Sequence, residues 1–199
     1  MAEEIIDNPD RDDYAGRNRD AIYRMVTGGR PDSLREIVRA LGGTRAVADL
    51  TGRSQRTVQR WITTSGTERI RAPRADAAQA LNTAFDQARN TREGRQRIAD
   101  TRRATQLRNN GARMRGSARA GIVTPGGSRA YIKSRVWDHA VGSDTMSKTL
   151  DAYVEGGEDA AFGAFNESFG AEYGGDGAMF DEWLFTDMSG LEFGPDTGA

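Results

Sequence analysis

The stretch "TRAVADLTGRSQRTVQRWI", residues 44–62, predicts two short helices joined by a tight turn. Val47 and Leu50 recur at helical spacing before the turn, and we expect both to face inward. In the turn "TGRS", Gly52 can take a positive φ and Ser54 can cap the following helix. A helix of about seven residues, a turn of about four and a second helix of about eight match the helix-turn-helix motif.

The second helix of this motif, "QRTVQRWI", has an apolar face and a polar face. Val58, Trp61 and Ile62 lie at helical spacing and are expected to face inward. Gln can bond bidentately to adenine and Arg to guanine in the major groove, which assigns base contacts to the outer residues Gln55, Arg56, Gln59 and Arg60. Side chains near the starts of both helices can hold phosphates, and these are Thr44, Arg45, Ser54 and Thr57.

Further helices are predicted on either side of this motif. Ser33 and Glu36 form a capping box ahead of a helical run, and Thr44 can cap the helix after it. Downstream, "RADAAQALNTAFDQARN" carries a modest apolar stripe. We therefore predict a helical DNA-binding domain over residues 30–88, preceded by an acidic and disordered arm over residues 1–29.

Charge is strongly segregated along the chain, although the net charge is only −1. Residues 1–29 carry 7 acids and 4 bases, residues 30–135 carry 23 bases and 8 acids, and residues 136–199 carry 1 base and 14 acids. A basic block of this size is typical of a polyanion binder. We expect the acidic segment to fold against the basic one, or to pair with it in another subunit, when DNA is absent.

The basic block is densest over residues 89–119, which hold ten Arg against Glu93 and Asp100. Few large apolar residues occur there, so the segment is interpreted as an exposed basic connector. Its arginines are expected to hold DNA phosphates through counterion release, and the candidates are Arg95, Arg97, Arg102 and Arg103.

The remaining segment, residues 120–199, predicts a small α+β domain. "GIVTPGGSRAYIKSRVW" reads as two strands around a Pro-Gly-Gly turn. Two amphipathic helices follow over 143–157 and 158–175, and "EWLFTD" and "LEF" predict closing β segments. The phenylalanines of the second helix, at Phe162, Phe165 and Phe169, are interpreted as core. The whole chain is thus predicted to be α+β.

Several classes of function are disfavoured by the composition. The chain has no cysteine and a single histidine, His139, so no thiolate or histidine metal cluster and no catalytic triad is visible. Asp181, Glu182 and Asp187 could hold Mg²⁺, but solvated acidic surface is the better interpretation. We expect no enzymatic activity and no cofactor. No apolar run is long enough to span a bilayer and the first residues are acidic, which favours a cytoplasmic, DNA-associated protein.

Three segments together resemble a known family: "LGGTRAVADLTGRSQRTVQRWI", "IVTPGGS" and "FTDMSGLEF". The chain is similar to the terminal proteins, or telomere proteins, that cap linear replicons of actinobacteria, and to their plasmid-borne relatives. The resemblance runs from about residue 34 to residue 193 and is strongest over 43–60. The helix-turn-helix part is shared, in weaker form, with many regulators.

The resemblance implies a protein that recognises replicon ends and primes DNA synthesis there, with a DNA polymerase or another replication protein as partner. In the family, a threonine hydroxyl in a loop like Pro-x-Gly-Ser-Thr accepts the first nucleotide and stays attached to the 5′ end. Here the matching loop begins at Pro125, and Arg129 stands where that threonine is expected. Ser128 and Thr124 are the candidate attachment residues, and a plain hairpin turn is the alternative.

The sequence therefore predicts a protein that binds double-stranded DNA in the replication or end maintenance of a plasmid, phage or linear replicon. One alternative is a transcriptional regulator that uses the same motif and dimerises through its C-terminal domain. Another is a sequence-tolerant coating or packaging protein that self-associates into a homo-oligomer. A primer would carry a covalent nucleotide, a regulator would give a palindromic footprint, and a coating protein would cover any sequence.

Overall fold

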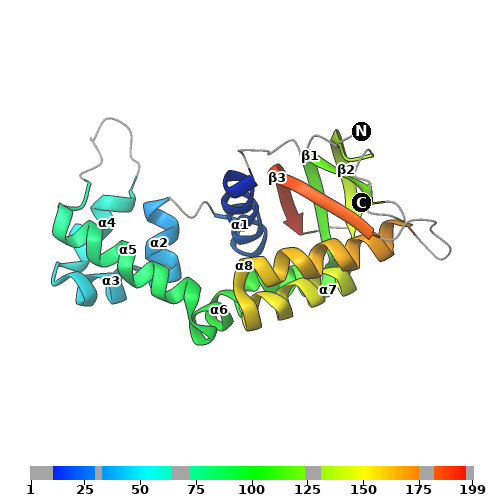
Figure 1. The fold of residues 1–199 in the computed structure, drawn as a ribbon. Helices are drawn as coiled ribbons and strands as arrows, with labels where there is room; N and C mark the ends of the chain where they lie inside the picture. The colour runs from blue at the N-terminus through cyan, green and yellow to red at the C-terminus, as the bar shows by residue number, and fades with distance from the viewer. Residues whose placement is uncertain (1–10, 30–32, 64–71, 124–130, 175–181, 196–199) are drawn as a thin grey trace.

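The computed structural model describes most of the chain, namely residues 11–29, 33–63, 72–123, 131–174 and 182–195. These residues form an α+β fold, as predicted. Figure 1 shows a group of short helices at one end of the molecule and a sheet at the other, with the first helix between them.

Four helices make up the helical end: α2 (Leu34–Ala40), α3 (Gly43–Thr51), α4 (Gln55–Ile62) and α5 (Ala75–Asn90). Their shared core contains Val47, Val58, Trp61 and Leu81, each at most 6% exposed. Leu50 was expected to face inward, but it is 46% exposed at the end of α3. These four helices thus pack around a core of few large side chains.

The sheet has three antiparallel strands in the order β2-β1-β3: β1 (Ala112–Val123), β2 (Lys133–Val141) and β3 (Glu182–Pro195). The two strands predicted on either side of the Pro-Gly-Gly segment pair antiparallel as β1 and β2, and their register runs without a shift from Ala112↔Val141 to Ala120↔Lys133. The predicted turn itself lies outside the described residues. β1 begins inside the segment that was expected to be a connector. The two predicted closing segments join into β3, which pairs with β1 through register shifts near Arg119.

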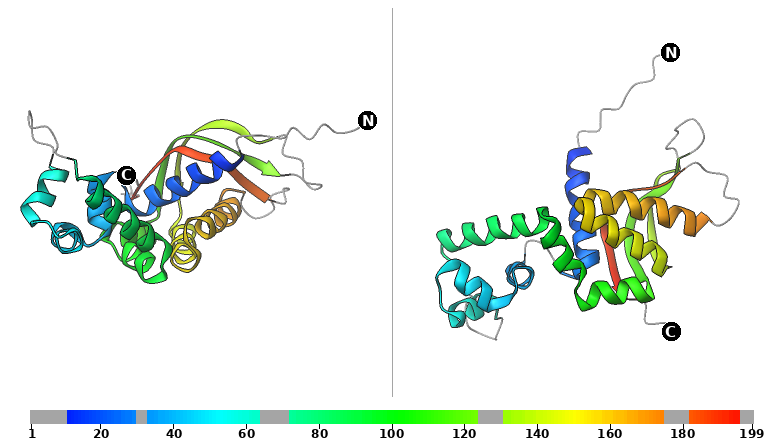
Figure 2. Two further views of the ribbon diagram at one scale, coloured as in Figure 1. Left: turned by 60° about the vertical axis from the view of Figure 1, so that its left-hand side comes forward. Right: turned by 90° about the horizontal axis from the view of Figure 1, so that it is seen from below.

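One face of the sheet packs against α8 (Ser143–Gly174), which lies below the strands in the left view of Figure 2. The two predicted helices of this region form α8 and are separated by Gly157, whose φ of 77° interrupts the helix. Phe165 and Phe169 are fully buried and stack on each other, with ring centroids 5.6 Å apart. Trp137 of β2 packs edge-on against Phe169, which confirms the interpretation of these phenylalanines as core.

Helix α1 (Arg11–Thr27) replaces most of the disordered arm that was expected over residues 1–29. Its Ile22 and Met25 are fully buried, and the helix runs alongside β3 (Figures 1 and 2). Asn18 completes the edge of β3, because its amide donates to the carbonyl of Thr186 and accepts from the N–H of Met188, at 3.0 and 2.8 Å. The first helix and the last strand therefore belong to one core, across the predicted domain boundaries.

The segment expected to be an exposed basic connector is also part of the fold. It forms α6 (Arg92–Ala99), α7 (Arg102–Asn110) and most of β1. Ile98, Ala104 and Leu107 are buried, and both helices pack against α8. Each helix has only two buried apolar residues, Ile98 and Ala99 in α6 and Ala104 and Leu107 in α7. So few apolar residues among many arginines do not predict a buried helix face.

Candidate nucleic-acid interface

The turn between α3 and α4 is built as the sequence predicts. Gly52 has a φ of 63°, and its N–H and that of Arg53 both donate to the carbonyl of Ala48. Ser54 caps α4, since its hydroxyl accepts from the N–H of Thr57 at 3.2 Å. The left-handed glycine and the cap fix the angle at which α4 leaves the turn.

Helix α4 separates an inner and an outer face. Val58 is fully buried and Trp61 is 6% exposed, so the inner face is anchored in the helical core. The predicted base-reading residues Gln55, Arg56, Gln59 and Arg60 are all exposed. In the described part of the chain, Arg56 and Arg60 make no ion pair, so both guanidinium groups are available to a ligand.

The residues assigned to phosphate contacts near the helix starts differ in their exposure to solvent. Arg45 and Ser54 are exposed, whereas Thr44 and Thr57 are half-buried. Thr44 does not cap α3, because that helix begins at Gly43. Its hydroxyl instead accepts from Nε2 of Gln55 at 3.0 Å, which ties the start of α3 to the start of α4.

Two arginines that the sequence analysis did not single out support this unit from outside its core. Arg53 forms an ion pair with Asp76 at 2.7 Å, and so connects the turn to α5. Arg35 donates to the carbonyl of Ile62 at 3.2 Å, at the C-terminal end of α4. A cation at a helix C-terminus is favourable, and Arg35 fixes that end of α4 against α2.

The structure contradicts the phosphate-binding prediction for Arg95. This side chain is 8% exposed and lies between two helix ends. It donates to the carbonyls of Val154 and Glu155, where the first half of α8 ends, each at 2.9 Å. It also donates to the carbonyl of Asn90 at the end of α5, at 2.9 Å. Arg95 is therefore an internal clamp on two helix C-termini.

Arg103 is also engaged by backbone carbonyls within the fold. Its guanidinium is half-buried and donates to the carbonyl of Met25 at 3.1 Å and to that of Phe193. Burial lowers the pKa of Arg103, and the nearby Arg39 lowers it further. The other two connector candidates, Arg97 and Arg102, are exposed as expected.

Within the described parts of one chain, the acidic segment folds against the basic one, which is the first of the two arrangements that the sequence analysis gave. Arg92 pairs with Glu155 at 2.6 Å and Arg108 with Asp151 at 2.7 Å, both along α8. On the sheet, Asp138 accepts from Arg113 and Arg115, and these hydrogen bonds lower the pKa of its carboxyl group. Five arginines of the basic block thus pair with acids of the segment 136–199, namely Arg89, Arg92, Arg108, Arg113 and Arg115.

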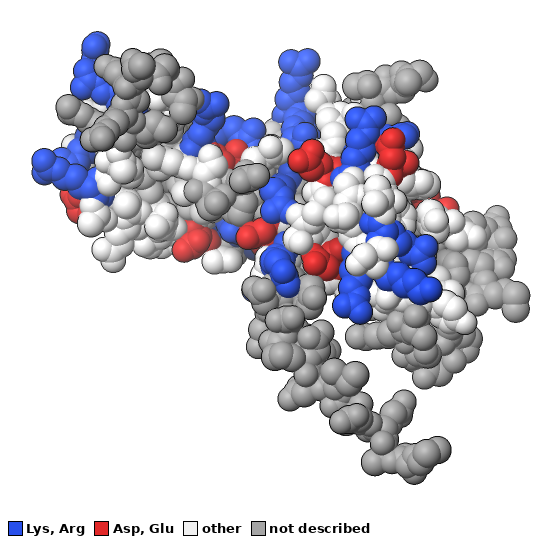
Figure 3. All heavy atoms as spheres, turned by 90° about the horizontal axis from the view of Figure 1, so that it is seen from above, with Lys and Arg blue, Asp and Glu red and all other residues white. Residues whose placement is uncertain are grey.

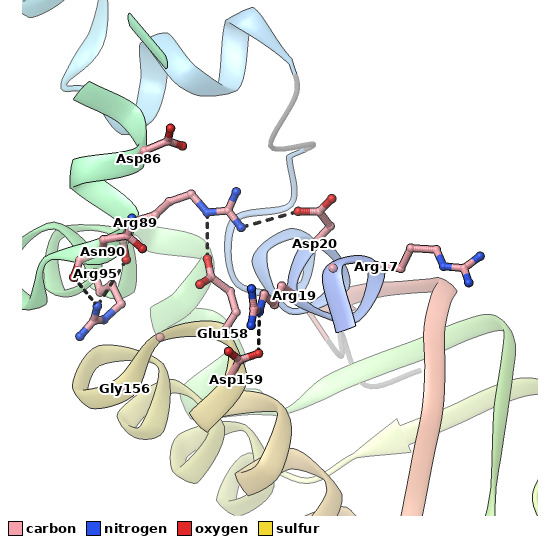
Figure 4. Close-up of a pocket in the computed structure, with 12 residues that line it drawn as sticks. Arg17, Arg19, Asp20, Asp86, Arg89, Asn90, Arg95, Gly156, Glu158 and Asp159 are labelled. Carbon is pink, nitrogen blue, oxygen red and sulfur yellow. Dashed lines mark hydrogen bonds and ion pairs between the residues drawn. The ribbon is translucent and has the colours of Figure 1, made fainter. Parts of the chain in front are cut away.

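Arg89 joins the helical end to the rest of the molecule (Figure 4). Its guanidinium pairs with Glu158 at 2.9 Å and Asp20 at 3.6 Å, and lies 4.7 Å from the ring centre of Tyr23. Arg89, Glu158 and Asp20 line a cleft of about 640 Å³ between α1, α5 and α8, together with the ion pair of Arg19 and Asp159. Because these ion pairs join three helices across the cleft, its structural role is to hold the helical end against α1 and α8.

Other predicted positions fall partly outside the described residues. The candidate attachment residues Ser128 and Thr124 lie there, as do Asp181 and the side chain of Glu182. The carboxylate of Asp187 accepts from the N–H of Ser189 at 2.8 Å. The ring of His139 packs edge-on against Phe169 and Tyr173, which is a structural role.

Comparison of the chain with protein-family models, with curated proteins and with solved structures gave no match. None of the described helices combines the length and apolar character that crossing a bilayer requires. Among the described residues, no three acidic or histidine side chains cluster in a way that could hold a metal ion.

Proposed function

We propose that this protein binds double-stranded DNA with α4 in the major groove. The observation that carries the proposal is the outer face of α4, where Gln55, Arg56, Gln59 and Arg60 are exposed above a buried face. Gln and Arg at successive outward positions supply bidentate donors and acceptors for adenine and guanine. The capped turn and the ties from Arg35 and Arg53 hold this face rigidly.

The internal pairing of other arginines supports this assignment by contrast. Arg92, Arg108 and Arg113 are paired with acids, and Arg95 is engaged with backbone carbonyls. Arg56 and Arg60 have no such partners in the described part of the chain. Cationic side chains left without an internal partner are the ones able to release counterions from DNA.

We further propose that the DNA-binding role belongs to replication or end maintenance of a plasmid, phage or linear replicon. The support is the sequence resemblance to terminal proteins. Its sharper form is priming by a hydroxyl of the segment that contains Thr124 and Ser128, with a DNA polymerase as partner.

A transcriptional regulator is the alternative function that uses the same face of α4. The coating alternative has less support, because five of the ten arginines in the stretch 89–119 on which it depends pair with acids of the segment 136–199.

The assignment of α4 is tested with the Arg56→Ala and Gln59→Ala variants of the full chain. Sites are first enriched from a pool of random 20-bp duplexes with the unaltered protein. Each variant should then bind the enriched duplex about 1–3 kcal/mol more weakly, because a bidentate base contact is lost. Unfolding curves should be unchanged, since both side chains are exposed.

The matched control is Gln79→Ala, which removes an exposed glutamine on α5. It should leave both the affinity and the sequence preference unchanged. If Arg56→Ala and Gln59→Ala bind the enriched duplex as tightly as Gln79→Ala does, α4 does not read the bases.

A further inference from the structure

The β1–β2 hairpin carries its basic residues in two groups. At one end, Arg113 and Arg115 share the single carboxylate of Asp138, with distances of 2.5 and 3.2 Å. Towards the other end, Arg119, Lys133 and Arg135 are exposed, and none of them forms an ion pair within the described residues. The same two strands therefore compensate part of the positive charge at one end and hold three cations without an ion pair at the other.

The register places these three cations close together. Arg119 of β1 is the direct partner of Ser134, which lies between Lys133 and Arg135. Strands are about 4.8 Å apart and rise about 3.3 Å per residue, so the three Cα atoms lie within roughly 10 Å. That distance is about one Debye length at physiological salt, so the electrostatic potentials of the three charges overlap at the end of the hairpin.

The nearby polar groups offset this charge only in part. Asp187 of β3 is the partner of Arg119 across the sheet, and its carboxylate accepts from the N–H of Ser189 and forms no ion pair with Arg119. One carboxylate beside three cations leaves the hairpin end positive. Arg135 donates through Nε to the carbonyl of Ala120 at 3.2 Å, which fixes the base of its guanidinium. Successive residues of a strand point to opposite faces, so Arg119 projects from one face and Lys133 and Arg135 from the other.

We propose that this hairpin end is a second contact with duplex DNA, formed by Arg119, Lys133 and Arg135 and directed at the phosphate backbone. The choice of DNA as the polyanion rests on the function proposed for α4. The two surfaces lie at opposite ends of the molecule in Figure 1, and Figure 3 shows Lys and Arg side chains both over the helical end and over the sheet. The hairpin contact is independent of sequence, because it offers lysine and arginine to phosphates and no base-reading helix.

The chain supplies a matched pair of variants, because Lys133 and Lys148 are its two lysines and both are exposed. The full chain, Lys133→Gln, Lys133→Gln with Arg119→Gln, and Lys148→Gln are titrated with a random-sequence 20-bp duplex at several salt concentrations. The slope of log K against log salt is negative, and each lost phosphate contact reduces its magnitude by about 0.9. We expect the magnitude to decrease by about 0.9 for Lys133→Gln, by about 1.8 for the double variant, and not at all for Lys148→Gln.

A double variant with the same salt slope as Lys148→Gln would overturn the hairpin contact, provided that its melting temperature matches that of the unaltered protein. The result is separable from the test of α4. The double variant Arg56→Ala with Gln59→Ala should lose the sequence preference. Adding Lys133→Gln to that variant should still reduce the magnitude of the salt slope by about 0.9. If the sequence preference survives in that variant while Lys133 still controls the slope, α4 is wrongly assigned and the hairpin contact stands.

Discussion

Arg95 shows how an arginine that looks like a DNA ligand in the sequence can serve the fold. Its guanidinium bonds to carbonyls of Asn90, Val154 and Glu155, which belong to two helix C-termini. These carbonyls have no partners within their helices, and the helix dipoles place partial negative charge on them. One planar group with five donors satisfies both ends at once.

Replacing Arg95 with Gln should lower the free energy of unfolding by about 3 kcal/mol, because several charge-assisted hydrogen bonds are lost and buried carbonyls remain unsatisfied. Urea denaturation followed by circular dichroism measures the change. Arg97→Gln, two residues away and exposed, is the control and should change the value by less than about 0.5 kcal/mol. Equal effects of the two substitutions would contradict the clamp.

The sequence could not distinguish Arg95 from Arg97. Both lie in the same short helix among other arginines, and the partners of Arg95 on α8 are about 60 residues further along the chain. By contrast, Arg56 and Arg60 were predictable as exposed, because Val58 and Trp61 define the buried face of their own helix. Residue roles set by local periodicity were predictable, and roles set by distant contacts were not.

At the scale of elements, the turn between α3 and α4 depends on the left-handed conformation of Gly52. Gly52→Ala should destabilise the protein by roughly 1 kcal/mol, because a Cβ is disfavoured at a φ of 63°. Gly163→Ala is the matched control, since Gly163 is exposed inside α8 with open space around its Cα. There the same change should stabilise by about 0.4–1 kcal/mol.

Thermal unfolding of the two glycine variants provides the measurement. The melting temperature should fall for Gly52→Ala and rise for Gly163→Ala. The turn is not in the left-handed conformation if both substitutions raise the melting temperature. Binding to the enriched duplex should also weaken for Gly52→Ala, because the turn sets the direction of α4.

Elements with strong local signals were predicted well. The turn, the cap at Ser54, the β1–β2 hairpin and the two parts of α8 all follow from caps, glycines and periodicity. The helices α1, α6 and α7 were missed as parts of the core. α6 and α7 carry few apolar residues between many charges, and the described buried apolar residues of α1 lie in its second half. The burial of all three helices depends on β3 or α8. Their sequences alone resemble exposed or disordered segments.

At the scale of the whole molecule, pairing between segments of opposite charge decides which arginines remain available. Arg92 and Arg108 face Glu155 and Asp151 on α8. Surface pairs of this kind add little stability, but each occupies a guanidinium that could otherwise hold a phosphate. The net charge of −1 therefore does not predict which arginines can bind a polyanion, whereas the arrangement of the ion pairs does.

Neutralising Asp151 and Glu155, as Asp151→Asn with Glu155→Gln, should release Arg108 and Arg92 to bind DNA. Non-specific affinity for random duplex should rise at low salt, and the salt slope should steepen by up to about 0.9 for each released arginine. The control is Asp144→Asn with Glu167→Gln, which makes the same change in net charge at exposed acids that hold no arginine in the described structure. Equal slopes for the two double variants would show that only net charge matters.

The contact of α1 with β3 also has a consequence for synthesis on the ribosome. Asn18 and its partner Thr186 are separated by 168 residues, so almost the whole chain must be translated before they can meet. At about 5–20 residues per second, the buried side of α1 waits on the order of ten seconds or more in the nascent chain. The contacts among α2, α3 and α4 are local, and such contacts form quickly. The helical end can therefore fold before β3 has been translated, whereas the sheet with its flanking helices closes only after β3 has left the ribosome, with the first helix exposed to chaperones until then.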